Sequence, residues 1–204
     1  MRKIFVTGIG TDVGKTFIAA ILTEALQADY WKPIQCGSLE LSDTQRVKRL
    51  VSSKASVFHP EAYQFSDPVS PHEASKIADR KIQLGKLTPP ETDNTLIIEG
   101  AGGIMVPYNY RGDTMIEIME HCEAEIVVVV RNYLGSINHS LLTLETLKNK
   151  GLPILGVIFN GEPNAESEQV ILNKSKLNCL GRIPHEYEIS KELVKKYAHD
   201  YVFI

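Results

Sequence analysis

The chain has 204 residues, of which 43% are hydrophobic and 23% are charged. These values exclude an intrinsically disordered chain, and the length predicts a single domain over residues 1–204. Lys and Arg number 22 against 25 for Asp and Glu, a formal net charge of −3, so no overall positive field favours a nucleic-acid partner. The apolar runs fall short of the ~20 residues of a membrane span, and the start lacks the apolar stretch of a signal peptide. We therefore expect a cytoplasmic protein with no membrane and no nucleic-acid partner.

Cysteine and histidine spacing gives no sign of a metal centre. Cys36, Cys122 and Cys179 are widely separated and form no CxxC pair, and the six histidines form no HxxxH arrangement. Zinc ligands cluster at short spacings, so we expect reduced thiols and no zinc site.

Short apolar runs alternate with stretches of helical period along the chain. This alternation predicts an α/β fold with a mostly parallel sheet and helices on both of its faces. Residues 82–94 carry two prolines and little periodicity, which indicates a surface connection. The expected strands are 3–8, 30–33, 95–99, 125–131, 153–160 and 179–183. The expected helices are 14–28, 43–51, 72–80, 114–121, 136–150, 164–175 and 188–198.

The clearest helical pattern covers residues 136–150. Ser136 is placed to cap the first turn, four apolar residues between 137 and 147 form a stripe, and Gly151 follows two lysines. These features predict an amphipathic helix that ends at this glycine.

The strongest chemical signal is GIGTDVGKT at residues 8–16, between an expected strand and an expected helix. This order indicates a P-loop NTPase-like phosphate cradle, in which Lys15 reaches the β- and γ-phosphates and Thr16 binds Mg²⁺. The loop is a variant, because five residues separate Gly8 from Gly14. Val13 stands where a dinucleotide-binding GxGxxG motif needs glycine. The alternative is a glycine-rich turn in which GKT occurs by chance.

Several polar residues end apolar runs, where open α/β sheets bind their ligands. Glu99 precedes a glycine-rich turn and is a candidate Mg²⁺ ligand, or a solvated turn residue. Lys32, held extended by the following proline, could neutralise charge near the γ-phosphate. The alternative for this residue is an ordinary surface lysine. Asp43 is either a metal ligand or an acid at a helix start.

Asn160 ends the strand PILGVIFN and precedes a glycine. Its amide could pair with the edge of adenine, or it could serve as a turn residue. A guanine-binding NKxD motif would need Asp where Pro163 stands, so ATP is favoured over GTP.

In its ordered motifs the chain resembles the dethiobiotin synthetase family over nearly its whole length. The matching segments are FVTGIGTDVGKT, KPIQCGS, SD at 42–43, SPHEAS, IIEGAGG, VPYN, VVVRNYLGSINHSLLT, GVIFNG and LGRIP. The resemblance implies a ligase that uses ATP and Mg²⁺ to close 7,8-diaminononanoate and CO2 into a cyclic urea, as a step of biotin biosynthesis. A carbamate forms first, the γ-phosphoryl group activates it, and the second amine displaces phosphate.

The resemblance also implies roles for individual residues. The catalytic positions are Lys15 and Lys32, and the Mg²⁺ positions are Thr16, Asp43 and Glu99. The positions matching ATP contacts are Asp12, Val13, Gly14, Lys15, Thr16, Phe17, Asp43, Glu99, Gly100, Ala101, Gly102, Asn160, Gly161 and Pro184. The positions matching substrate contacts are Thr11, Asp12, Cys36, Leu134, Gly135, Ser136 and Asn138.

The segment Leu134–Asn138 matches the part of the family that receives the substrate carboxylate across a dimer interface. A helix N-terminus, with free amides and about +0.5 of effective charge, suits a carboxylate. The resemblance therefore implies a homodimer with active sites at its interface. The chain departs from the family at Cys36, where Ser or Thr is common, and in lacking a tyrosine soon after Asn160, where Ser167 stands.

A partition-type or metallochaperone P-loop ATPase is the alternative, in which hydrolysis switches a partner. The partition branch starts its loop with a second lysine in a KGG sequence, where this chain has Thr7 and Gly8. The sequence therefore favours the ligase.

Overall fold

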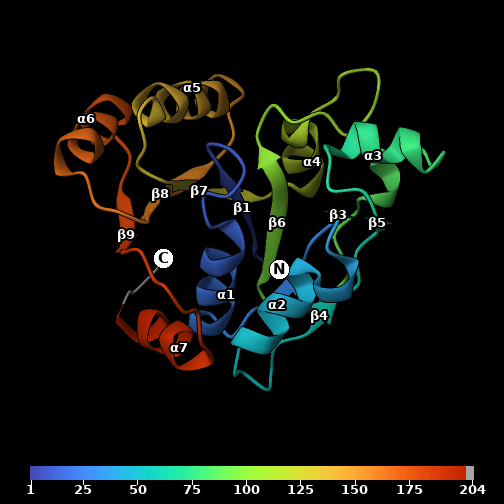
Figure 1. The fold of residues 1–204 in the computed structure, drawn as a ribbon, viewed down its shortest axis with the longest axis horizontal. Helices are drawn as coiled ribbons and strands as arrows, with labels where there is room; N and C mark the ends of the chain where they lie inside the picture. The colour runs from blue at the N-terminus through green and yellow to red at the C-terminus, as the bar shows by residue number, and fades with distance from the viewer. Residues whose placement is uncertain (201–204) are drawn as a thin grey trace.

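A seven-stranded parallel sheet forms the centre of the protein (Figure 1). The computed structural model describes residues 1–200, and the last four residues of the domain expected over 1–204 lie outside the described part. The strands are β1 (Lys3–Gly8), β2 (Asp29–Trp31), β3 (Ile34–Cys36), β4 (Phe58–His59), β5 (Tyr63–Phe65), β6 (Leu96–Gly103), β7 (Glu125–Val130), β8 (Ile154–Asn160) and β9 (Cys179–Ile183). The helices are α1 (Lys15–Ala25), α2 (Asp43–Leu50), α3 (Pro71–Ile77), α4 (Met115–Cys122), α5 (Ser136–Asn149), α6 (Ala165–Ser175) and α7 (Lys191–Asp200), with 3₁₀ turns at Leu39–Leu41 and Leu84–Lys86.

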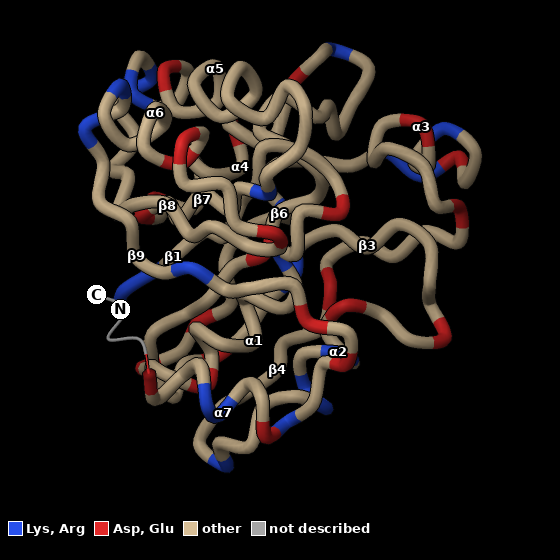
Figure 2. The backbone as a smooth tube through the Cα atoms, turned by 60° about the vertical axis from the view of Figure 1, so that its left-hand side comes forward, with Lys and Arg blue, Asp and Glu red and all other residues tan. Residues whose placement is uncertain are grey.

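The main sheet has the strand order β4-β2-β6-β1-β7-β8-β9, and all of its pairings are parallel. Figure 2 shows α4, α5 and α6 on one side of the sheet and α1, α2 and α7 on the other. After β1 the chain adds β2 and β4 toward one edge of the sheet and then places β6 between β2 and β1. It then adds β7, β8 and β9 on the other side of β1, so the direction in which strands are added reverses beside β1. This arrangement confirms the predicted α/β fold with helices on both faces.

The central strands are hydrophobic on both faces because helices cover both faces. Ile4, Phe5 and Val6 of β1 and the apolar residues 126–130 of β7 have no exposed surface. Among residues 1–200, no helix is long and apolar enough to span a membrane.

The largest difference from the expected elements lies around β2. This strand ends at Trp31, and the chain then starts β3, which pairs with β5 in a separate two-stranded sheet. The sequence analysis missed β3, β4 and β5, because strands of two or three residues are too short to show a period. β6 also continues past Glu99 to Gly103, where it pairs with Gly8.

One further expectation is wrong. Ser136 is the first residue of α5 and not its cap; Gly135 precedes it at a φ of 103°, and no side chain caps the helix. Glycine adopts this left-handed conformation without strain. Residues 82–94 form the expected surface connection, since they contain only a 3₁₀ turn and bury only Ile82 and Leu87.

The helix boundaries otherwise shift by a few residues. α7 begins at Lys191 where 188 was expected, and α3 ends at Ile77 where 80 was expected. Gly151, at a φ of 70°, follows the last turn of α5 as predicted.

Candidate active site

The P-loop joins β1 to α1 at the end of the central strand. Gly14 precedes α1 at a φ of 95°, and a Cβ there would lie 2.1 Å from the side-chain Nδ2 of Asn160. A Cβ on Gly8 would lie 2.4 Å from Val13. Both positions therefore need glycine, which explains how this spacing variant still closes into a tight loop.

Lys15 is the first residue of α1 and is only 7% exposed. Its Nζ donates a hydrogen bond of 2.7 Å to the carbonyl of Gly10, across the mouth of the loop. Burial and the nearby charge of Lys32 lower the pKa of Lys15 to about 8, against the opposing effect of Glu99. A desolvated ammonium at the start of a helix is suited to an arriving phosphate group.

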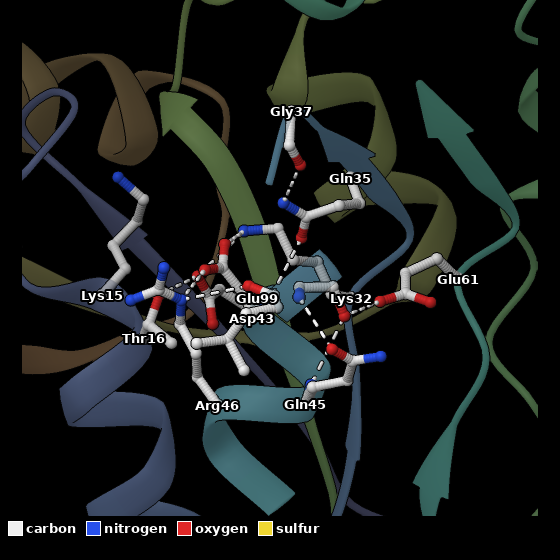
Figure 3. Close-up of polar contacts among 12 residues, drawn as sticks. Lys15, Thr16, Lys32, Gln35, Gly37, Asp43, Gln45, Arg46, Glu61 and Glu99 are labelled. Carbon is white, nitrogen blue, oxygen red and sulfur yellow. Dashed lines mark hydrogen bonds and ion pairs between the residues drawn. The ribbon is translucent and has the colours of Figure 1, made fainter. Parts of the chain in front are cut away.

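Glu99 is the centre of a polar cluster at the end of the sheet (Figure 3). Its carboxylate is 1% exposed, and one oxygen, Oε1, accepts hydrogen bonds from Thr16 Oγ1 at 2.8 Å and Lys32 Nζ at 3.0 Å. Lys32 also donates to the carboxylate of Asp43. The structure thus brings together Thr16, Lys32, Asp43 and Glu99, and their contacts with Mg²⁺ and phosphate stay predictions.

Lys32 is 6% exposed, and its charge is balanced by two carboxylates. Burial alone would lower its pKa, but Glu99 and Asp43 outweigh this effect and raise the pKa to about 12. The pKa of Lys32 therefore lies above its usual value, whereas the pKa of Lys15 lies below it.

Asp43 reaches the cluster because α2 begins at this residue. Ser42 caps the helix in a reciprocal pair with Gln45, and the amide of Asp43 donates to Gln35 Oε1 at 3.2 Å. The two roles weighed for Asp43 from the sequence are compatible, because the acid at the helix start also faces Lys32.

The residues expected around the base also lie together. Asn160 donates through Nδ2 to the carbonyl of Val13 at 2.9 Å, and the amide of Gly161 donates to the carbonyl of Ile183, the residue before Pro184. The ring of Phe17 packs against the ring of Tyr197 of α7 at a centroid distance of 6.1 Å, and its side chain is buried.

The glycines that end β6 permit a close approach to the P-loop. A Cβ on Gly100 would lie 2.6 Å from the ring of Phe5, and Gly102 adopts a φ of 66° with Thr11 Oγ1 3.6 Å from its ideal Cβ. Ala101 between them is half-buried, and Asp12 is exposed at a φ of 57°.

The remaining expected substrate residues lie outside the Glu99 cluster. Leu134, Gly135 and Asn138 line an open cavity of about 780 Å³ between the starts of α5 and α6, whereas the side chain of Ser136 is buried. Cys36 lies at the end of β3, and burial raises the pKa of its thiol to about 11, so the thiol is neutral.

Sequence reasoning missed three polar residues that support these positions. Tyr30 donates to Glu99, Arg131 donates through Nη1 to the carbonyl of Asp12 at 3.2 Å, and Glu168 accepts from Asn132 Nδ2 at 2.9 Å. Arg131 directly follows β7, so the search for polar strand ends could have found it. Glu168 gave no signal, because two of its partners, Asn132 and Arg182, come from other elements of the fold.

Comparisons with known proteins show the family of the chain. The chain matches the AAA domain family over residues 2–192. It is 46% identical over 200 residues to the ATP-dependent dethiobiotin synthetase BioD of Christiangramia forsetii, covering 98% of this chain and 96% of that protein. It is also 46% identical over 199 residues to the protein of the same name from Cytophaga hutchinsonii, covering 97% and 96%.

Solved structures show the same fold at low sequence identity. The septum site-determining protein MinD of Pyrococcus horikoshii has a TM-score of 0.58 at 15% identity, covering 98% of this chain and 95% of that one. A ParA family ATPase from Chlorobium tepidum has a TM-score of 0.54 at 15% identity, covering 98% and 90%. The near full-length identity to the synthetases, set against a likeness of fold alone to the ATPases, shows that this chain belongs to the ATP-dependent dethiobiotin synthetase family.

Proposed function

We propose that this protein is a dethiobiotin synthase, which closes 7,8-diaminononanoate and CO2 into the cyclic urea of dethiobiotin and converts ATP to ADP and phosphate. The observation that carries the proposal is the pair of buried lysines beside the P-loop, Lys15 and Lys32, which lie close to the carboxylate of Glu99. A carbamate and a γ-phosphate repel each other, so a site that joins them needs concentrated positive charge.

The reaction has three steps. An uncharged amine of the substrate attacks the carbon of CO2 and loses a proton, which gives a carbamate. A carbamate oxygen then attacks the γ-phosphorus, and ADP leaves. The second amine attacks the carbamate carbon, phosphate leaves, and the ring closes with loss of the remaining proton. In this scheme Lys15 contacts the transferred phosphoryl group and Lys32 lies toward the carbamate, so the protein supplies mostly position and charge.

Mg²⁺ fits the donor set of this cluster. The hydroxyl of Thr16 and the carboxylates of Asp43 and Glu99 are hard oxygen donors, and Mg²⁺ is commonly held by one or two carboxylates together with nucleotide phosphates. Among residues 1–200, no group of three or more His, Cys, Asp or Glu side chains is placed to hold a metal ion. When bound, Mg²⁺ would neutralise charge on the β- and γ-phosphates.

The cavity beside α5 supports a carboxylate site in a homodimer. No side chain caps the start of this helix, and the amide of Ser136 donates to the carbonyl of Tyr133, so the amides of Ile137 and Asn138 are left to receive the substrate carboxylate. Leu134, which precedes α5 and lines the cavity, is fully exposed, and Leu142 of α5 is 59% exposed. These two side chains form an apolar surface that a second copy of the chain would cover. The proposed location of the enzyme is the cytoplasm.

The partition-type ATPase is not favoured as a second function. Its solved structures share only the fold with this chain, at 15% identity in both cases compared above. A switch ATPase would also hydrolyse ATP without any need for a diamine.

The test is a defined reaction that contains the protein, bicarbonate, ATP, Mg²⁺ and 7,8-diaminononanoate. We expect mass spectrometry to detect the cyclic urea in a one-to-one ratio with released phosphate. Lys32→Gln should lower turnover by two orders of magnitude or more, roughly the effect of losing one preorganised charge. Lys54→Gln, at an exposed lysine, is the matched control and should not change turnover. Phosphate release that is independent of the diamine would overturn the proposed function.

A further inference from the structure

Tyr30 contacts the same carboxylate as the catalytic cluster, from the opposite side. Its hydroxyl donates to Glu99 Oε2 at 2.7 Å, whereas Thr16 and Lys32 both donate to Oε1. The side chain of Tyr30 is fully buried, so water does not compete for this hydrogen bond. The phenol therefore holds the one carboxylate oxygen that the cluster does not use.

The phenol is fixed in place before any ligand arrives. Tyr30 lies in β2, where it pairs with Phe58 of β4 on one side and Ile97 of β6 on the other. Its amide donates to the carbonyl of Val57, and its ring packs at 6.3 Å from the ring of Phe58. Lys32, the residue after the end of β2, reaches the other oxygen of the same carboxylate.

The hydroxyl is the donor of this hydrogen bond, because the carboxylate of Glu99 can only accept.

We propose that Tyr30 is a positioning residue, whose hydroxyl fixes Glu99 so that Oε1 stays directed at Thr16 and Lys32. Without the hydroxyl, Oε2 would be a buried acceptor with no partner, which is costly. The carboxylate could reduce this cost by rotating Oε1 away from Thr16. The inference rests on the proposed role of Thr16, Asp43 and Glu99 as Mg²⁺ ligands.

Tyr30→Phe tests this role, with Tyr63→Phe as the matched control. Tyr63 is also buried, and its hydroxyl accepts a hydrogen bond of 3.1 Å from the amide of Gln83, away from the carboxylates. Calorimetry would measure ATP affinity with EDTA and then across a Mg²⁺ titration. In Tyr30→Phe, the gain in ATP affinity that Mg²⁺ provides should fall about tenfold, the effect of one hydrogen bond to a charged group. Affinity without metal should stay within about twofold of the wild type, and Tyr63→Phe should match the wild type in both measurements.

Equal Mg²⁺ dependence in Tyr30→Phe and Tyr63→Phe would overturn the inference, even if both variants lose thermal stability. If Tyr30→Phe does not fold, Phe58→Leu loosens the packing of the phenol ring while keeping its hydroxyl, and a weaker effect in the same direction is then required. A wild-type protein that binds ATP with Mg²⁺ but forms no dethiobiotin would contradict the proposed reaction and leave this test intact.

Discussion

Replacing Lys32 by Met separates the structural role of this residue from its chemical role. The ammonium is 6% exposed and pairs with Glu99, which is 1% exposed, and with Asp43, whose side chain is 24% exposed. Met has a similar length and no charge, so the substitution leaves two carboxylates facing each other with no cation between them. Removing one partner of a buried ion pair costs about 3–5 kcal/mol. We therefore expect Lys32→Met to lower the free energy of unfolding by roughly this amount.

The double variant Lys32→Met, Glu99→Gln should recover part of this loss. The glutamine amide in place of the Glu99 carboxylate would carry no charge, so the repulsion inside the cluster disappears, and the partly exposed Asp43 keeps its ion pair with Arg46 at 4.0 Å. Because neither catalytic charge is restored, turnover should stay at the level of Lys32→Met.

Urea unfolding can follow both variants through Trp31, the only tryptophan of the chain, which is buried beside Lys32. Lys54→Met is the control, because substitutions at exposed positions usually change stability by about 0.5 kcal/mol or less. A Lys32→Met protein as stable as this control would show that the ion pair is not formed. Recovery of turnover in the double variant would show that the charge of Lys32 has no part in the reaction.

The pKa shifts and the proposed dimer lead to three further expected outcomes. Phosphate favours the charged form of Lys15, whose pKa is about 8 in the free protein, so ATP affinity should fall above pH 8 by up to about tenfold per pH unit. Calorimetry should show this dependence on pH for the wild type and not for Lys15→Met. Burial raises the pKa of Glu24, but hydrogen bonds from Ser52 and Ser53 lower it below 4.5 overall. The stability that Glu24 contributes is therefore present above pH 4.5 and is lost as the pH falls through its pKa in the folded protein, so the free energy of unfolding of Glu24→Gln, measured with urea, should depend less on pH in acid. If two subunits build each site, an equal mixture of inactive Lys15→Met and Asn138→Ala chains should recover about a quarter of wild-type turnover, because half of the dimers are mixed and each of these has one intact site. No recovery after verified subunit exchange would contradict a shared site.

The sequence predicted the residues of the site better than their contacts. Lys15 and Thr16 belong to a local motif, and Glu99 ends a run of apolar residues, so each was visible within a short window of sequence. The contact between Lys32 and Glu99 depends on the pairing of β2 with β6, whose partners are 67 residues apart. No local pattern encodes that register, and for the same reason the sequence analysis assigned no role to Tyr30.

The small second sheet was missed for a related reason. β3 and β5 have three residues each, and their pairing forms only after the chain turns at Pro33. The turn carries Gln35 toward the start of α2, where its side chain accepts from the amide of Asp43. The position of Asp43 in the site therefore depends on a pairing that periodicity cannot reveal.

The pKa values of Lys15 and Lys32 shift in opposite directions because only Lys32 forms ion pairs with the nearby carboxylates. Lys32 contacts both Asp43 and Glu99, which more than offsets the cost of its burial, and its pKa rises to about 12. Lys15 is hydrogen-bonded to a neutral carbonyl and lies near the positive charge of Lys32, so burial dominates and its pKa falls to about 8. A phosphate bound at the loop would supply the negative charge that Lys15 lacks. The charge of Lys15 is therefore coupled to nucleotide binding, whereas the charge of Lys32 belongs to the folded protein itself.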